Sequence, residues 1–259
     1  MGYNSKTIDE EAIQQADYLI NLAGAGIADK SWTEERKKLI ISSRVHSTLT
    51  FKKYIEASPN QFKAYIAASA MGFYGNRGDE ILTETSEPGE TGFLAQSVIE
   101  WESAIQEVMK TNIRTVALRI GLVLSTKGGA LPKILIPARL GVGSYFGDGQ
   151  QWYAWIHLDD ICRMFVYAVE NQATKGFYNA TAPNPLRNKT FVVAIGEALG
   201  KPQLLVPAPV FALRLGLGEL ADAVLSSARV LPKRMEEAGF EFQFKTLVPA
   251  LQDLFHRSV

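Results

Sequence analysis

Apolar residues gather in short uninterrupted runs that alternate with longer segments of mixed polarity. Three runs have the length of buried strands and are followed by small residues: residues 18–24, 62–69 and 113–125. Two segments between them predict helices: residues 33–57, which Thr33 begins as a cap, and residues 94–110. This alternation predicts an α/β fold, with a parallel sheet covered by helices on both faces and with all three runs as central strands.

The pattern of apolar and polar residues changes after residue 125. Residues 126–153 are rich in glycine, and residues 155–171 read as a short strand followed by a helix with Asp159 or Asp160 as its N-cap. Further elements are expected at residues 177–183 (strand) and at 7–17, 188–199, 209–226 and 246–256 (helices). We therefore divide the chain into residues 1–125 and an α+β domain at 126–259, with 155–183 as a segment that could join the first and leave the second as the smaller domain.

Composition excludes several classes of protein. Lys+Arg and Asp+Glu both number 27, so the formal net charge is +0, which predicts no general attraction to nucleic acid or an anionic membrane. A single cysteine, Cys162, excludes an internal disulfide and is expected to be a small buried side chain. No stretch approaches the length of a transmembrane helix and no apolar core of a signal peptide is visible, so we expect a cytoplasmic location.

Small residues follow three of the predicted strands. They lie at Asn21-Leu22-Ala23-Gly24-Ala25-Gly26, at Ala68-Ser69-Ala70-Met71-Gly72 and at Arg119-Ile120-Gly121. Tight packing of strand against helix is one interpretation; a shelf on which a flat ligand lies close to the backbone is the other, favoured by three such ends in succession. A glycine-rich dinucleotide fingerprint begins at Gly24 but is not completed, because residue 29 is Asp.

A set of motifs spread over the whole chain resembles one family. The motifs stand at residues 20–38, 67–75, 118–125, 128–133, 155–161, 179–185 and 229–244. Together they are similar to the atypical, extended-type branch of the short-chain dehydrogenases/reductases, the NAD-dependent epimerase family with a C-terminal domain of unknown function. The resemblance implies a Rossmann-like NAD(P)-binding domain at residues 1–125, a substrate-side and C-terminal domain at 126–259, and a small-molecule or sugar-nucleotide substrate.

The same resemblance implies roles for individual residues. Ser69 stands where the family carries its catalytic serine, and Tyr74 is similar to the loop tyrosine that follows it, which we assign to the substrate. The cofactor, NAD(P) with NADP slightly favoured, is expected to contact the small-residue loops and one cation: Asn21, Leu22, Ala23, Gly24, Ser69, Ala70, Arg119 and Gly121.

Two departures from the family pattern modify this expectation. The first strands and the glycine-rich turn of the family have no counterpart here, so we expect an N-terminally truncated chain that binds dinucleotide weakly or not at all. Such a sheet would have an open edge beside the strand at 18–24, which predicts aggregation or a homodimer. The family's Tyr-x-x-x-Lys pair is also missing, because the matching positions are Phe93 with Ser97 and Leu94 with Val98.

Other residues could supply chemistry or contact a substrate. His157 with Asp159 could act as an acid/base pair, or His157 could pack inside a strand while Asp159 caps the next helix. Three substrate-side candidates lie after the glycine-rich stretch: Gln151, Trp152 and Trp155, which could equally dock on their own domain. Arg119 and Arg139 are the candidates for an anionic group. The three histidines lie too far apart in the sequence to indicate a metal site.

Three hypotheses about function remain open at this point. The first is an NAD(P)-dependent epimerase/dehydratase-type oxidoreductase without the Tyr-Lys pair. The second is a non-catalytic module that binds NAD(P) or a partner. The third is an inactive, truncated fragment.

Overall fold

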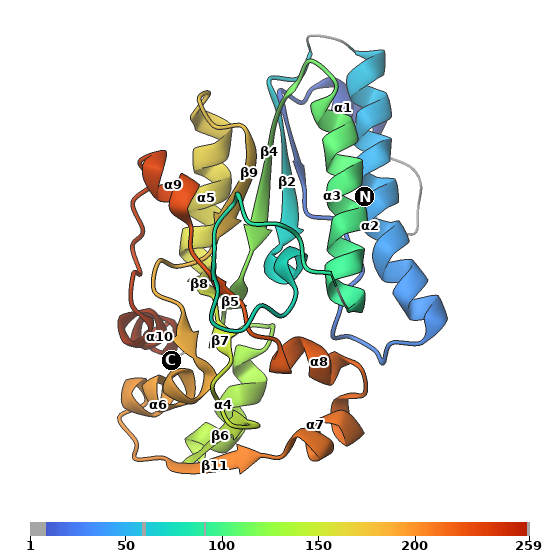
Figure 1. Ribbon diagram of the computed structural model, residues 1–259. Coiled ribbons are helices and arrows are strands. Elements are labelled where there is room, and N and C mark those ends of the chain that lie inside the picture. Colours follow the sequence, from blue (N-terminus) through green and yellow to red (C-terminus); the bar gives the residue numbers. More distant parts are fainter. Residues whose placement is uncertain (1–8, 59–60, 91, 258–259) are drawn as a thin grey trace.

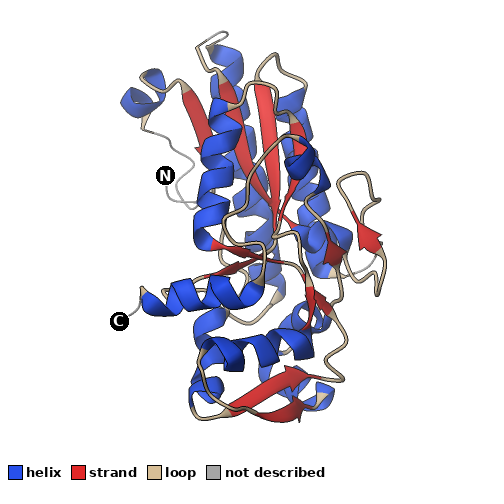
Figure 2. Cartoon of the chain, turned by 90° about the vertical axis from the view of Figure 1, so that its left-hand side faces the viewer, coloured by secondary structure: helices blue, strands red, loops and turns tan. Residues whose placement is uncertain are grey.

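A four-stranded parallel sheet forms the centre of the molecule (Figures 1 and 2). The computed structural model describes residues 9–58, 61–90 and 92–257. In spatial order the strands are β1 (Tyr18–Asn21), β2 (Ala64–Ala70), β4 (Arg114–Ile120) and β9 (Gly176–Ala180). All neighbouring strands are parallel, which confirms the predicted α/β class.

Helices cover both faces of this sheet because alternate side chains of each strand point to opposite faces. On one face Tyr65 and Ala67 of β2 lie in a cluster with Trp101 and Ile105 of α3 (Phe93–Met109), and α2 (Glu34–Ala57) packs beside α3. On the other face Ile66 packs with α5 (Leu158–Glu170). Figure 1 shows α2 and α3 on one side of the sheet and α5 on the other.

The predicted strand at 113–125 is two strands. The chain leaves the main sheet at Gly121, whose N–H donates to Ala180 O at 3.1 Å, and continues as β5 (Leu122–Leu124). β5 pairs in parallel with β8 (Trp155–His157). A run of apolar residues does not reveal this change of partner, because the sequence stays apolar through both strands, although Leu122 and Val123 are only half-buried.

Gly121 is required by close packing rather than by its backbone angles. A Cβ at this position would lie 2.7 Å from Ala154 O and 2.8 Å from a methyl carbon of Thr181. Because a backbone carbonyl cannot move aside cheaply, Gly121→Ala should lower the free energy of unfolding by about 1–3 kcal/mol in urea denaturation. Gly128→Ala is the matched control, since nothing lies within 4 Å of its added carbon. Equal stability of the two variants would contradict this account.

The second half of the chain surrounds a separate core. Its helices α4 (Leu131–Arg139), α6 (Asn188–Ala198) and α10 (Leu247–His256) pack together with Trp155. The remaining elements are α1 (Glu10–Gln14), η1 (Met71–Tyr74), β3 (Ile81–Leu82), β6 (Val142–Phe146), β7 (Trp152–Tyr153), β10 (Leu186–Arg187), β11 (Leu204–Ala208), α7 (Val210–Leu217), α8 (Leu220–Leu225), β12 (Arg229–Val230) and α9 (Lys233–Glu237). β9 lies in the main sheet, so this part of residues 155–183 joins the strands of the first half of the chain. The division into two domains near residue 125 stays a prediction.

Three local expectations are corrected. The helix predicted at 209–226 is broken into α7 and α8 at Gly218, which has a φ of 58°. The N-cap of α5 is His157 rather than Asp159 or Asp160, because the helix begins directly after β8. Cys162 is exposed on α5 rather than buried.

β1 lies at the edge of the main sheet among the described strands. Ile20 is 46% exposed and Leu22 63% exposed, whereas Leu19 is buried against α3 and α2. Within the residues that the structure describes, no helix is long and apolar enough to cross a membrane.

An open strand edge with an exposed isoleucine predicts self-association. We expect the purified chain to form dimers or larger species in light scattering after gel filtration, and Ile20→Lys to raise the monomer fraction because a charge on an edge strand opposes pairing. Val166→Lys is the control, because Val166 is 54% exposed but lies on α5. A monodisperse wild-type monomer that melts above about 55 °C would be evidence against an aggregation-prone edge.

Candidate functional site

The candidate site lies where the parallel strands of the main sheet end. The carboxyl ends of β1, β2 and β4 carry Asn21, Ser69 and Arg119, which belong to strands that pair side by side. Ligands of open α/β sheets bind at this edge. The topology therefore brings the three predicted loops together.

The first loop is held in place by Asn21. This side chain is buried, donates from Nδ2 to Tyr65 Oη at 2.8 Å and accepts from the backbone N–H of Ala23 at 3.1 Å. Both ends of the amide are therefore used inside the chain. What the loop presents is Leu22, which is exposed, and Ala23 and Gly24, which are half-buried. The loop after β2 adds Ala70 and the residues of η1 up to Phe73, all of which are half-buried.

Ser69 is part of a buried ion-pair network. Its Oγ donates to Glu102 Oε1 at 2.6 Å, and Glu102 accepts both Nε and Nη2 of Arg119 at 2.9 and 2.8 Å. All three side chains are at most 4% exposed. Glu102 lies on α3 and was not predicted from the sequence. Since a carboxylate neutralises Arg119 in a bidentate pair, its guanidinium is not free to meet an external anion.

Tyr74 extends this network toward β9. Its hydroxyl accepts from Arg119 Nη1 at 2.9 Å and lies 2.7 Å from Asn179 Oδ1, to which it donates. Burial raises the pKa of Tyr74, although Arg119 opposes the shift. Arg119 also lies 3.6 Å above the ring of Phe73. Tyr74 is fully buried, so it supports the edge from within rather than facing a ligand.

The start of α3 offers no proton-transfer pair. Phe93 packs edge-on against Trp32 with ring centroids 4.9 Å apart, and Ser97 donates to Leu94 O at 2.8 Å. Val98 lies against Gly72. The side chains at these positions pack against neighbours or make local hydrogen bonds, and none of them is a tyrosine or a lysine.

His157 is enclosed by its own chain. The ring is fully buried and stacks on Phe244 with centroids 3.9 Å apart. Nδ1 accepts from the N–H of Asp159 at 3.0 Å, and Nε2 lies 3.2 Å from Asp253 Oδ2. Burial lowers the pKa of His157, while Asp159 and Asp253 oppose the shift. A role as acid or base with Asp159 would need the chain around it to open.

Among the described residues, His157 and its two neighbouring carboxylates form the group that most resembles a cation site. Ligand atoms of His157, Asp159 and Asp253 lie within 4.8 Å of one another. Because Nδ1 accepts a hydrogen bond, the proton of the neutral ring is on Nε2, which therefore cannot ligate a metal. Arg257 also pairs with both carboxylates, at 2.7 and 2.8 Å. This chemistry suits a closed ion-pair cluster; the expectation of no metal stays a prediction.

The predicted substrate residues do not share one surface. Trp155 is fully buried and donates to Asn184 O at 3.0 Å, and Gln151 is buried with its amide on Phe146 O at 3.2 Å. Trp152 is half-buried, and the guanidinium groups of Arg187 and Arg229 lie 4.4 and 4.5 Å from the centroid of its ring.

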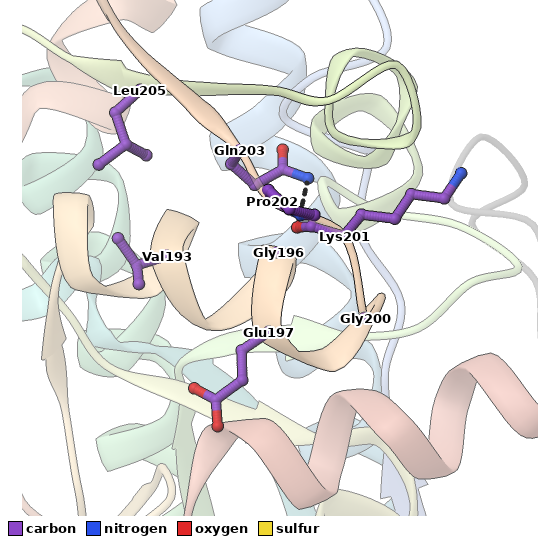
Figure 3. Close-up of a pocket in the computed structure, with 8 residues that line it drawn as sticks. All are labelled: Val193, Gly196, Glu197, Gly200, Lys201, Pro202, Gln203 and Leu205. Atoms are coloured by element: carbon purple, nitrogen blue, oxygen red, sulfur yellow. Dashed lines mark hydrogen bonds between the residues drawn. The ribbon is translucent and has the colours of Figure 1, made fainter.

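Arg139 is exposed at the end of α4, where its carbonyl accepts from Lys201. Lys201 lines a hollow of about 390 Å³ between α6 and β11 (Figure 3). None of the residues that line it comes from the carboxyl ends of β1, β2 or β4.

The fold and this edge define a class: α/β proteins with the parallel sheet of Rossmann-like, NAD(P)-binding epimerases and short-chain dehydrogenases/reductases. A family model described as the NAD dependent epimerase/dehydratase family matches residues 4–180, and a domain of unknown function, DUF1731, matches residues 208–254. The chain belongs to the NAD dependent epimerase/dehydratase family, as the sequence motifs predicted.

Similar proteins agree with this assignment. The epimerase family protein YfhF of Bacillus subtilis is 38% identical over 245 residues, which cover 95% of this chain and 80% of that protein. The human epimerase family protein SDR39U1, solved with NADPH, is 29% identical with a TM-score of 0.88, covering 95% of this chain and 85% of that one. A nucleoside-diphosphate sugar epimerase from Corynebacterium glutamicum is 31% identical with a TM-score of 0.77, covering 98% of this chain and 49% of that one.

Proposed function

We propose that this chain binds a nicotinamide dinucleotide along the carboxyl edge of its main sheet and brings it beside a small-molecule substrate. The observation that carries the proposal is the shelf formed by Leu22, Ala23 and Gly24 together with Ala70 to Phe73, which are the accessible parts of two adjacent strand ends. Small residues let the flat face of a ring approach the backbone. When bound, the dinucleotide would supply hydride transfer; the chain's own residues hold and orient it.

The residues present fit such a group at the shelf. Gly24 packs closely on Arg44, since an added Cβ would lie 3.0 Å from Arg44 Cζ and would require that side chain to shift. Asn21, Ser69 and Gly121 support the shelf from within, since their polar atoms or their lack of a side chain serve packing inside the chain. Of the solved structures, SDR39U1 was obtained with NADPH and a UDP-glucose 4-epimerase from Thermus thermophilus with NAD. NADP is the slightly favoured form in this proposal.

Binding by this chain of 259 residues should nevertheless be weak. No complete glycine-rich fingerprint stands in its sequence, so the usual anchor for the pyrophosphate at a helix N-terminus is missing. We expect dissociation constants above about 100 μM for NADPH and NADH in isothermal titration calorimetry, and still weaker binding by Gly24→Val. Gly216→Val is the matched control, because Gly216 lies on α7 and nothing lies within 4 Å of its added Cβ. Submicromolar binding by the wild-type chain would refute the weak anchoring.

The proposed substrate class is a small molecule such as a sugar nucleotide. Its support is family membership and the similarity to the Corynebacterium glutamicum nucleoside-diphosphate sugar epimerase. Turnover of the epimerase/dehydratase type would have to use an acid or base other than the family's usual pair, because α3 begins with packed apolar side chains.

One observation favours a second function, a non-catalytic NAD(P)-binding module. Ser69 Oγ is buried and its proton is directed to Glu102 rather than to the shelf. Assays with nucleotide sugars and NAD(P) distinguish the two functions. Turnover that is lost with Ser69→Ala assigns a catalytic role to this serine, and dinucleotide binding without turnover supports the binding module.

A further inference from the structure

Two arginines lie behind the loop that follows β1. Arg36 Nη2 donates to Gly26 O at 2.5 Å, and Arg44 Nη1 donates to Ala25 O at 2.9 Å. The two side chains come from the first half of α2, eight residues apart, and contact consecutive carbonyls of the same loop. The loop therefore brings two guanidinium groups to one place, beside the shelf proposed for the cofactor.

Neither guanidinium is satisfied by the chain. Each one makes its hydrogen bonds to described residues through a single nitrogen: Nη2 of Arg36, to Gly26 and Asp29, and Nη1 of Arg44, to Ala25 and Ile40. The Arg36 side chain is only 10% exposed, and its Nε is buried with no hydrogen-bond partner among the described residues. A guanidinium offers five N–H donors, so most of them remain available.

The nearby acidic residues compensate these charges only in part, because Glu34 pairs with Lys37 and Glu35 is exposed in the first turn of α2. Among the described residues, the carboxylate of Asp29 lies 3.5 Å from Arg36 and is 68% exposed, and no carboxylate forms an ion pair with Arg44. Arg36 is the third residue of α2, where the helix dipole disfavours a cation. Burial and the neighbouring charge of Arg36 both lower the pKa of Arg44. Two cations lie in this half-buried place: Arg36 pairs only with an exposed carboxylate at 3.5 Å, and Arg44 has no ion-pair partner among the described residues, so the pair can accept a further anion.

Arg119 shows what a satisfied arginine looks like in this molecule. All three of its guanidinium nitrogens have partners, and two of them bond Glu102. The sequence pointed to Arg119 and Arg139 for an anionic ligand, but at this edge of the sheet the less compensated charges are those of Arg36 and Arg44.

We propose that Arg36 and Arg44, with the loop of residues 22–29, form a binding site for an oxyanion, the phosphate of a nucleotide or of a phosphorylated substrate. Planar guanidinium groups suit phosphate because they donate in pairs. Gly24 belongs to the shelf and lies against Arg44, with an added Cβ only 3.0 Å from Arg44 Cζ, so the anion site adjoins the proposed dinucleotide position. The site itself rests on charges and contacts of the chain and does not depend on the proposed function.

The test uses pyrophosphate as the probe, in calorimetric titrations at constant ionic strength. Wild-type protein should bind it, and Arg36→Gln and Arg44→Gln should each bind about tenfold more weakly, as expected for loss of charge-assisted hydrogen bonds. Arg44→Lys keeps the charge without the planar guanidinium, so its affinity for pyrophosphate should lie between those of the wild type and Arg44→Gln. Lys63→Gln is the matched control: it removes one positive charge at the opposite end of the sheet, just before β2, from a side chain that is 61% exposed.

The outcomes separate a ligand site from a structural role. If Arg36→Gln and Arg44→Gln bind pyrophosphate as Lys63→Gln does, the two arginines only hold the loop and the proposal is wrong. Should Arg44→Gln unfold, because its guanidinium also lies 5.2 Å from the ring of Trp101, Arg36→Gln decides the matter. Thermal melts of each variant confirm that the folded state is being titrated.

Nucleotide pairs then assign the source of the phosphate. Weaker binding of NADP⁺ and NAD⁺ by the arginine variants assigns the anion to the cofactor, and weaker binding of UDP but not of uridine assigns it to a nucleotide substrate. Pyrophosphate binding without any dinucleotide binding would sustain the anion site while contradicting the proposed function. Dinucleotide binding that neither substitution affects, together with no pyrophosphate binding, would support the proposed function and contradict the anion site.

Discussion

Arg119→Met should lower the free energy of unfolding by about 3–5 kcal/mol, the loss typical of breaking a buried ion pair from one side. The substitution leaves Glu102 buried at 2% exposure with Ser69 as its remaining partner. It also removes the cation that lies above Phe73 and the donor to Tyr74 Oη. Urea denaturation followed by circular dichroism measures the difference.

Arg77→Met is the matched control for this experiment. Arg77 makes the same two-pronged contact with Glu80, at 2.8 and 2.7 Å, but the side chains are 26% and 47% exposed. An exposed pair contributes less than about 1 kcal/mol, because water screens it and solvates the partner that is left. If both substitutions cost the same, the buried network does not stabilise the carboxyl edge in the way its geometry implies.

The sheet could be predicted because each of its strands leaves a local signature. The runs around β1, β2 and β4 are apolar enough to be buried on both faces, and the helix between the first two carries its own cap, Thr33 on Arg36 N–H. The predictions that were wrong concern features that depend on which distant residue a position contacts. The break at Gly121 follows from the approach of Ala154, and the cap of α5 by His157 follows from where β8 ends.

The candidate site was predictable in place but not in detail. Strand ends in a parallel sheet meet at one edge, so Asn21, Ser69 and Arg119 could be expected together. Whether Arg119 faces a ligand or a carboxylate depends on Glu102, which is 17 residues away and on another element. One signal was present in the sequence: Glu102 lies three residues before Ile105 on the buried face of α3, where an unpaired charge would be costly.

The last expectation concerns Asp160, which ties the C-terminal segment to the rest of the molecule. This carboxylate has no exposed surface, and its two oxygens accept from the backbone N–H groups of Gln243 and Phe244 at 3.0 and 2.9 Å. It lies in the first turn of α5, where the helix dipole favours a negative charge. Phe244 in turn stacks on His157, and α10 begins three residues later.

Asp160→Asn should therefore destabilise the chain by about 2–4 kcal/mol, because an amide can accept at only one of the two positions and points an N–H₂ group at the other donor. The released segment should also become a site of early cleavage near residues 241–246 in limited proteolysis, since α10 loses its anchor. Asp159→Asn is the control next door: its carboxylate is 33% exposed and pairs with Arg257, whose side chain is 52% exposed, so its loss should cost less than about 1 kcal/mol. Equal losses, or unchanged proteolysis in Asp160→Asn, would mean that packing of Leu247, Leu251 and Leu254 in the second core holds the C-terminal helix without this carboxylate.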